Sequence, residues 1–118
     1  MNIFDYVAHE EQIFRQMAAQ VGYAPFTTFY ADLSIAECYG ASGITDTFER
    51  VSKEWLSNYK YWTEFTLCLN WKSWEMADRN NVELGSLYAD LYYKARDMFY
   101  DKYEGNNEAT SYFFEVTD

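Results

Sequence analysis

The chain has 118 residues, of which 49% are hydrophobic, enough for one hydrophobic core without a metal or a disulfide. Its 19 acidic residues against 9 Lys and Arg give a formal charge of −10. Binding to nucleic acid or to an anionic membrane requires positive charge, so this balance argues against both and favours a basic or DNA-binding protein as the partner.

The N-terminal residues predict a helix and no targeting signal. The first eleven residues, MNIFDYVAHEE, contain acids and no basic n-region, which argues against a signal peptide. Asn2 can cap a helix that runs to about Gln20, with one apolar face formed by Ile3, Val7, Phe14, Met17 and Val21. No apolar run in the chain approaches the roughly 20 residues of a membrane-spanning helix, so we expect a soluble, cytoplasmic protein.

Residues 22–43 predict a connection followed by short helical pieces. Gly22 and Pro25 are expected to end the first helix. Thr27 or Thr28 can cap a short helix, and Ser34 can cap one further turn. We expect the chain to leave this helical segment at the glycines 40 and 43.

The segment 44–76 is predicted to be the buried centre of the fold. It contains all four tryptophans and no Gly or Pro. Its apolar residues recur at spacings of three and four, as on one face of a helix: Phe48, Val51, Trp55, Trp62, Phe65, Leu69 and Met76. Thr45 or Asp46 is the predicted N-cap, with Glu49 in the capping-box position. Asn58 and Lys72 interrupt the apolar series, and residues 57–61 can bend or divide it.

Residues 63–69, TEFTLCL, fit two structures. Their β-branched and aromatic content, with apolar residues alternating against Glu64 and Thr66, suits a strand. The helical spacing continues on both sides and no turn dipeptide bounds the run, so we favour a helix.

The C-terminal third predicts one long helix and a docked tail. Residues 82–104 carry an amphipathic pattern, and Gly105 with the two following asparagines is expected to end it. The tail 108–116 is too apolar to remain in water and should pack on the rest. The sequence therefore predicts a compact all-α bundle of four to six helices, with residues 1–118 as a single helical domain.

Candidate catalytic residues are few. His9 is the only histidine, and Asp5 one turn before it could orient it for acid–base chemistry. A histidine in this position is more often an ordinary surface residue. The sequence contains no phosphate-binding glycine loop, no HExxH and no CxxC motif.

Cys38 and Cys68 are expected to be small core residues in a reducing compartment. We expect neither metal, cofactor nor catalysis.

Charge placement is the most informative functional feature. Five acids of the predicted 82–104 helix fall within about 40° of one direction at 100° per residue: Glu83, Asp90, Asp97, Asp101 and Glu104. We call this set the acidic stripe. Residues 81–118 hold eight acids against three bases, whereas residues 44–80 are nearly balanced at six against five.

The acidic stripe has two interpretations. An amphipathic helix needs a polar face, so the stripe can be a solvated surface, and Lys94 on the same face supports that reading. Alternatively, regularly spaced carboxylates can imitate the phosphates of DNA in a basic groove. In length, acidity and inferred helicity the chain resembles small acidic antirestriction proteins, which act as DNA mimics.

Aromatic residues suggest further contacts. Tyr88, Tyr92 and Tyr93 lie beside the acidic stripe, where each can serve either as a contact for a partner or as part of the core. With 21% aromatic residues, self-association into a homodimer is a separate possibility.

Several segments resemble a family of small acidic accessory proteins carried on conjugative transposons. The similarity lies in FYADLSIAECYG (29–40), DTFERVSKEW (46–55), NYKYWTE (58–64), LNWKSWE (69–75) and LYADLYYKA (87–95). The family has no assigned activity, so the resemblance implies a bacterial, mobile-element context and no site residue. Our leading hypothesis is a non-catalytic interaction protein that binds a protein partner. The alternatives are a DNA-mimic inhibitor of a DNA-binding enzyme and a small enzyme of unknown reaction.

Overall fold

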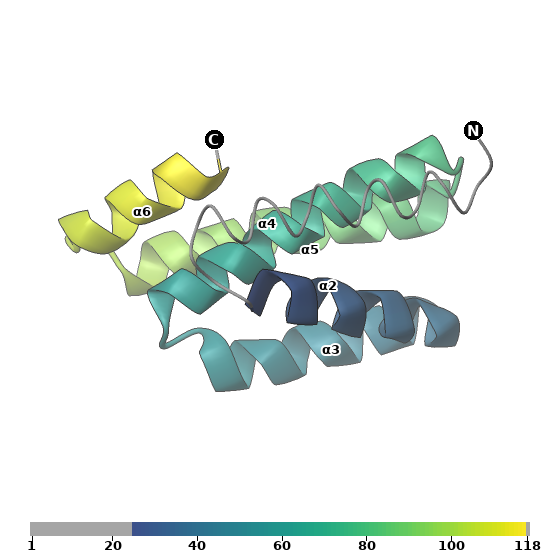
Figure 1. Cartoon of the computed structure of the whole chain (residues 1–118), viewed down its shortest axis with the longest axis horizontal. Coiled ribbons are helices and arrows are strands. Elements are labelled where there is room, and N and C mark those ends of the chain that lie inside the picture. The colour runs from purple at the N-terminus through teal and green to yellow at the C-terminus, as the bar shows by residue number, and fades with distance from the viewer. Residues whose placement is uncertain (1–24, 118) are drawn as a thin grey trace.

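The computed structural model describes residues 25–117, which form five α-helices and one short 3-10 helix (Figure 1). Their bounds are α2 Pro25–Ala36, η1 Glu37–Tyr39, α3 Gly40–Trp55, α4 Tyr59–Asp78, α5 Val82–Lys102 and α6 Asn107–Thr117. Within this range no residue is in a strand, which confirms the all-α prediction and the expected number of helices. The predicted helix 2–20, with Asp5 and His9, lies outside the described residues.

Helix α4 is the centre of the bundle. It contacts α2, α3, α5 and α6, and twelve of its 20 residues are buried. Figure 1 shows α5 running beside it along its full length. The stretch 63–69 is helical, so the strand alternative is wrong. Thr63 and Thr66, which suggested a strand, satisfy their hydroxyls by donating to carbonyls one turn earlier, at 2.7 and 2.8 Å.

Asparagine side chains set three helix starts. Asn58 accepts a hydrogen bond from the amide of Tyr61 at the start of α4, and Asn81 accepts one from Leu84 at the start of α5. Asn106 accepts in the same way at the start of α6. These caps satisfy amides that a helix start leaves unpaired. The central segment 44–76 is therefore divided, as residues 57–61 suggested, with α3 ending at Trp55 and α4 beginning at Tyr59.

Three predicted helix starts are wrong. Ser34 caps no further turn, because it lies inside α2 and its hydroxyl donates to the carbonyl of Tyr30 at 2.9 Å. Helix α2 begins at Pro25, whose fixed φ suits a first helical position, so no cap at Thr27 or Thr28 is needed. Helix α3 begins at Gly40 and not at Thr45 or Asp46. Gly40 has φ of 74°, and at Gly43 a Cβ atom would meet the carbonyl oxygen of Ala36 inside contact distance. The two glycines thus start α3 and let it approach the end of α2.

Large rings fill the centre, although the four tryptophans are not equally buried. Trp62 is fully buried and its Nε1 donates to the carbonyl of Ala95 on α5 at 2.9 Å. Phe48 and Phe65 pack on it with ring centroids 5.9 and 5.4 Å away. Trp55 and Trp71 are partly buried, whereas Trp74 is 55% exposed. The tryptophan-rich segment therefore supplies both the core and a part of the surface.

The C-terminal tail docks on the bundle as predicted, in the form of helix α6. Phe113 stacks on Phe99 of α5 at 4.2 Å between ring centroids. Tyr103 at the end of α5 donates to the carbonyl of Leu56 at 2.6 Å, which fixes the α3–α4 connection beside this end of the bundle. In the part of the chain that the structure describes, no helix combines the length and the apolar character that crossing a bilayer requires.

Candidate interaction surface

The acidic stripe lies in water along α5. Glu83, Asp90 and Asp97 are exposed, as are Asp101 and Glu104 near the end of the helix. The opposite face of α5, with Leu91, Ala95 and Phe99 among others, is buried. Among residues 25–117 none of the five stripe carboxylates forms an ion pair or a side-chain hydrogen bond. The stripe is therefore unneutralised within the described part of the protein.

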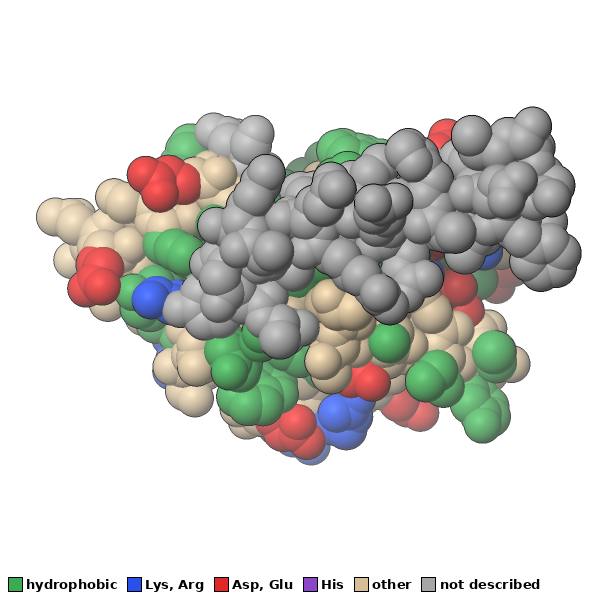
Figure 2. All heavy atoms as spheres, in the orientation of Figure 1, with side chains coloured by type: hydrophobic (Ala, Val, Ile, Leu, Met, Phe, Trp, Pro, Cys, Tyr) green, Lys and Arg blue, Asp and Glu red, His purple; other side chains and the backbone are tan. Residues whose placement is uncertain are grey.

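Two of the three basic residues of α5 lie over aromatic rings. The Lys94 ammonium lies 5.4 Å from the centroid of the Phe48 ring on α3, and the Arg96 guanidinium lies 5.0 Å from that of Tyr93. On α3, by contrast, Arg50 pairs with Glu54 at 3.6 Å and with Asp32 of α2 at 3.5 Å. Figure 2 shows acidic and basic side chains next to each other over α3, at the lower edge of the molecule. Among residues 25–117, the α5 surface combines five exposed acids without such pairing.

The three candidate tyrosines have different positions. Tyr88 is fully buried, so the structure removes it from the candidate contacts. Its hydroxyl donates to Glu37 Oε1 at 2.7 Å, and burial together with that carboxylate raises the pKa of Tyr88 well above its usual value. Tyr93 is 51% exposed. Tyr92 is partly buried and packs edge-on against Tyr93 at 5.2 Å. Tyr92 and Tyr93 therefore remain available for contact.

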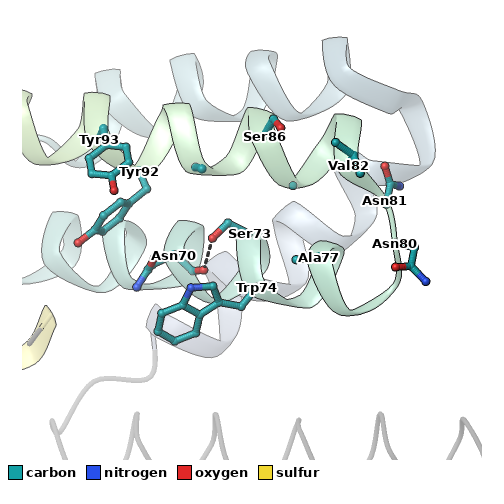
Figure 3. A pocket seen from close by; sticks show the side chains of 12 residues that line it. Asn70, Ser73, Trp74, Ala77, Asn80, Asn81, Val82, Ser86, Tyr92 and Tyr93 are labelled. Atoms are coloured by element: carbon teal, nitrogen blue, oxygen red, sulfur yellow. Dashed lines mark hydrogen bonds between the residues drawn. The ribbon is translucent and has the colours of Figure 1, made fainter.

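A groove of about 450 Å³ runs between α4 and α5 beside these tyrosines (Figure 3). None of its twelve lining residues carries a charge: Asn70, Ser73, Trp74, Ala77, Asn80, Asn81, Val82, Gly85, Ser86, Ala89, Tyr92 and Tyr93. Figure 3 shows Trp74 on α4 and the two tyrosines on α5 toward one end, with the turn at Asn80 and Asn81 at the other. The groove was not predicted, because it depends on small residues of two different helices lying side by side.

A buried charged cluster lies on another side of α4. The Lys72 ammonium is 2.8 Å from Glu37 Oε1 and 2.8 Å from Glu75 Oε2, and it lies 4.3 Å from the centroid of the Tyr30 ring. Glu75 Oε1 accepts hydrogen bonds from Tyr30 at 2.9 Å and from Arg79 at 3.0 Å. We call these groups the Lys72 cluster. The sequence signal for it was a lysine in a slot of the apolar series.

Glu64 is buried on α4 with much less support. Its Oε1 accepts a hydrogen bond from the Tyr112 hydroxyl of α6 at 3.3 Å, and its Oε2 has no hydrogen-bond partner within the described residues. Burial raises the pKa of Glu64 to about 7, an effect that the Tyr112 hydrogen bond partly opposes. This carboxyl stands at the packed contact between α4 and α6.

The two thiols differ in setting. Cys68 is fully buried and its Sγ lies 3.4 Å from the carbonyl oxygen of Phe26, consistent with a small core residue. Burial, followed by the nearby Glu64 carboxylate, raises the pKa of the Cys68 thiol. Cys38 is exposed, so its predicted core position is wrong. Both cysteines are free.

Comparisons with protein-family models, with curated proteins and with solved structures found no match to this chain. The structural features that bear on function are the unpaired acidic stripe, the exposed rings beside it and the neutral groove between α4 and α5.

Proposed function

We propose that this protein is a non-catalytic, acidic interaction protein that binds a basic protein partner through the exposed face of α5. The observation that carries this proposal is the acidic stripe, whose five carboxylates are exposed and have no cation paired to them among residues 25–117. A partner with clustered Lys and Arg would be attracted by that surface, and its approach would be accelerated at low salt.

The position of the charges supports a role in binding. Asp97 and Asp101 lie one turn apart near the C-terminal end of α5. Like charges at this spacing repel, and the helix dipole disfavours negative charge at a C-terminus. The acidic stripe thus contains charges that do not stabilise α5. The segments that resemble accessory proteins of conjugative transposons support a bacterial, cytoplasmic, mobile-element setting for this interaction.

Affinity capture with matched variants tests the proposal. Neutralising Asp90, Asp97 and Asp101 as Asn should remove most of the basic proteins that immobilised wild type retains from a bacterial extract at low salt. The control neutralises Asp46, Glu49 and Glu54 on α3, which are also exposed but interleaved with Arg50 and Lys53. Equal retention by the two triple variants would contradict a role for the α5 stripe.

A second candidate function is DNA mimicry. Positions 83 to 104 span roughly 30 Å at 1.5 Å per residue, enough to occupy several phosphate sites of a basic groove. The protein should then compete with DNA for a purified restriction enzyme, and the competition should weaken steeply with salt. Reversing Asp97 and Asp101 to Lys should reduce it, whereas reversing Asp46 and Glu49 should have little effect. Equal inhibition by both variants would exclude the stripe as the mimic.

A further inference from the structure

The floor of the α4–α5 groove is made of small side chains. Ser73 and Ala77 on α4 face Gly85 and Ala89 on α5. At Gly85 an added Cβ would be 3.5 Å from the Cβ of Met76, so the helices already lie close together here. Side chains normally fill the valley between two packed helices. Here small residues leave it open to solvent over α5 residues 82–93, roughly 17 Å at 1.5 Å per residue.

Large apolar side chains are exposed around this valley. Trp74 is 55% exposed, Val82 75% and Tyr93 51%, and all three line the groove (Figure 3). A solvent-exposed group of aromatic and aliphatic side chains around a concavity is typical of a surface that a partner covers. Burying a tryptophan or tyrosine is also the kind of contact that contributes most to binding.

Charge identifies the kind of occupant. The groove lining is neutral, but Val82 and Tyr93 lie only about 60 to 80° around α5 from the centre of the acidic stripe. A segment seated in the groove would therefore have the stripe along one side. A second copy of this chain, itself at −10, would bring two stripes near each other. A positively charged segment is favoured instead, because it would be attracted to the acidic stripe beside the groove.

The groove also favours a helix over an extended peptide. An extended segment needs hydrogen-bond partners for its backbone, and two polar side chains at the floor and the turn of the groove are already used. Ser73 donates to the carbonyl of Asn70 at 2.6 Å, and the Asn81 side chain caps α5. A helix satisfies its own backbone and packs its side chains into a valley with a small-residue floor.

We propose that the α4–α5 groove receives an amphipathic, basic helix of the partner, whose apolar face contacts Trp74, Ala77 and Tyr93 while its Lys and Arg reach the acidic stripe. The inference rests on the proposed function, because it assigns the recognised element of that basic partner. It adds a second requirement, an apolar helical face, to the requirement for positive charge.

Two synthetic peptides test the groove. The first is a 20-residue helix with Leu and Ala on one face and Lys on the other, and the second has the same composition scrambled so that no apolar face forms. Wild type should bind the amphipathic peptide at least tenfold more tightly in calorimetry. Ala77→Gln, which fills the floor without changing charge, and Trp74→Ser should each remove most of that difference. Phe114→Ser is the control, since Phe114 is 57% exposed on α6.

The outcomes distinguish binding in the α4–α5 groove from electrostatic attraction to the acidic stripe. Asp90→Asn with Asp97→Asn should weaken both peptides, because both carry the same charge. Equal binding of the two peptides by wild type, or no effect of Ala77→Gln and Trp74→Ser, overturns the groove proposal while a stripe effect leaves the proposed function standing. If the stripe variant binds both peptides as wild type does, the proposed function fails as well. A dimer in sedimentation that Trp74→Ser converts to monomer would assign the groove to a second copy and overturn the basic helix.

Discussion

Helix α4 buries two carboxylates in opposite ways. Glu75 has the Lys72 ammonium at 2.8 Å, the Arg79 guanidinium at 3.0 Å and the Tyr30 hydroxyl at 2.9 Å. Glu64, three turns earlier on the same helix, has one neutral donor among residues 25–117, the Tyr112 hydroxyl at 3.3 Å. A buried charge is tolerated when it is paired, and an unpaired carboxyl takes up a proton instead. The comparison shows that burial alone does not set the state of an acid; its neighbours do.

The two sites also connect different elements. The Lys72 cluster joins α4 to Glu37 of η1, to Tyr30 of α2 and, through Glu37, to Tyr88 of α5. Glu64 meets only α6 through its described hydrogen bond. Breaking the first site should therefore loosen three packing contacts together, whereas changing the second should mainly affect how α6 docks.

Removing the central cation should have the largest effect. Lys72→Met leaves Glu37 and Glu75 without their shared ammonium in a site where Lys72 is 1% exposed. Loss of one partner of a buried ion pair typically costs about 3 to 5 kcal/mol. Urea unfolding at pH 7 should show a loss of that size, and Lys53→Met on the exposed face of α3 should show little. A loss below about 1 kcal/mol would mean that the cluster is not the buried pair described.

Apolar periodicity in the sequence was sufficient for the fold class, because the apolar face of a helix is determined mainly by the residues of that helix. It predicted α5 and favoured a helix at 63–69, and the apolar content of 108–116 predicted a docked tail, which the structure shows as helix α6. It misplaced the start of α3, since Gly43 is required by the close carbonyl of Ala36, a contact between helices that spacing does not reveal.

The candidate site was only partly predictable for the same reason. The exposed stripe acids follow from positions on one helix, and the structure leaves all five in solvent. Tyr88 lies among apolar positions of α5, but only the packing of α2 and η1 shows that its hydroxyl is buried against Leu33 and Glu37. The groove and the Lys72 cluster each need side chains from several helices, which no single helical pattern contains.

Glu64 should make stability fall as pH rises. Its pKa in the fold is about 7 against a usual 4.5, so the folded state binds the proton more tightly than the unfolded chain. Its unfavourable contribution grows from pH 4.5 and is complete above pH 7. As the pH rises from 5 to 8, we expect the free energy of unfolding of Glu64→Gln to increase by about 2 kcal/mol relative to that of wild type, allowing for screening by solvent. Urea unfolding at both pH values measures this difference.

The other ionisable groups are common to both proteins, so their contributions cancel in the comparison. Parallel stability curves for wild type and Glu64→Gln from pH 5 to pH 8 would show that Glu64 is charged and supported in the fold. That result would remove the contrast with Glu75.

Tyr112 should have a smaller effect that depends on the charge of Glu64. The Tyr112 hydroxyl favours the ionised carboxylate, so Tyr112→Phe should raise the pKa of Glu64 further. We expect a loss of about 1 kcal/mol at pH 8 and a smaller loss at pH 5. Tyr39→Phe is the matched control, because Tyr39 is 74% exposed. An equal loss at both pH values would indicate that Tyr112 acts through packing and not through Glu64.

Exposed acids give the smallest expected effect and complete the comparison. Asp97→Asn with Asp101→Asn removes two exposed charges that lie one turn apart near the C-terminus of α5. Relief of their mutual repulsion and of the unfavourable dipole interaction should change stability by about 0.5 kcal/mol or less, toward a more stable fold. Urea unfolding at low salt measures this change, with Asp46→Asn and Glu49→Gln on α3 as the control pair of equal charge. The same α5 variant should lose affinity for the basic amphipathic peptide. Asp97 and Asp101 are expected to attract the Lys side chains of that peptide, although they do not stabilise the fold. A destabilisation above about 1 kcal/mol would instead assign these acids a structural partner and place them with Glu75 among the supported carboxylates.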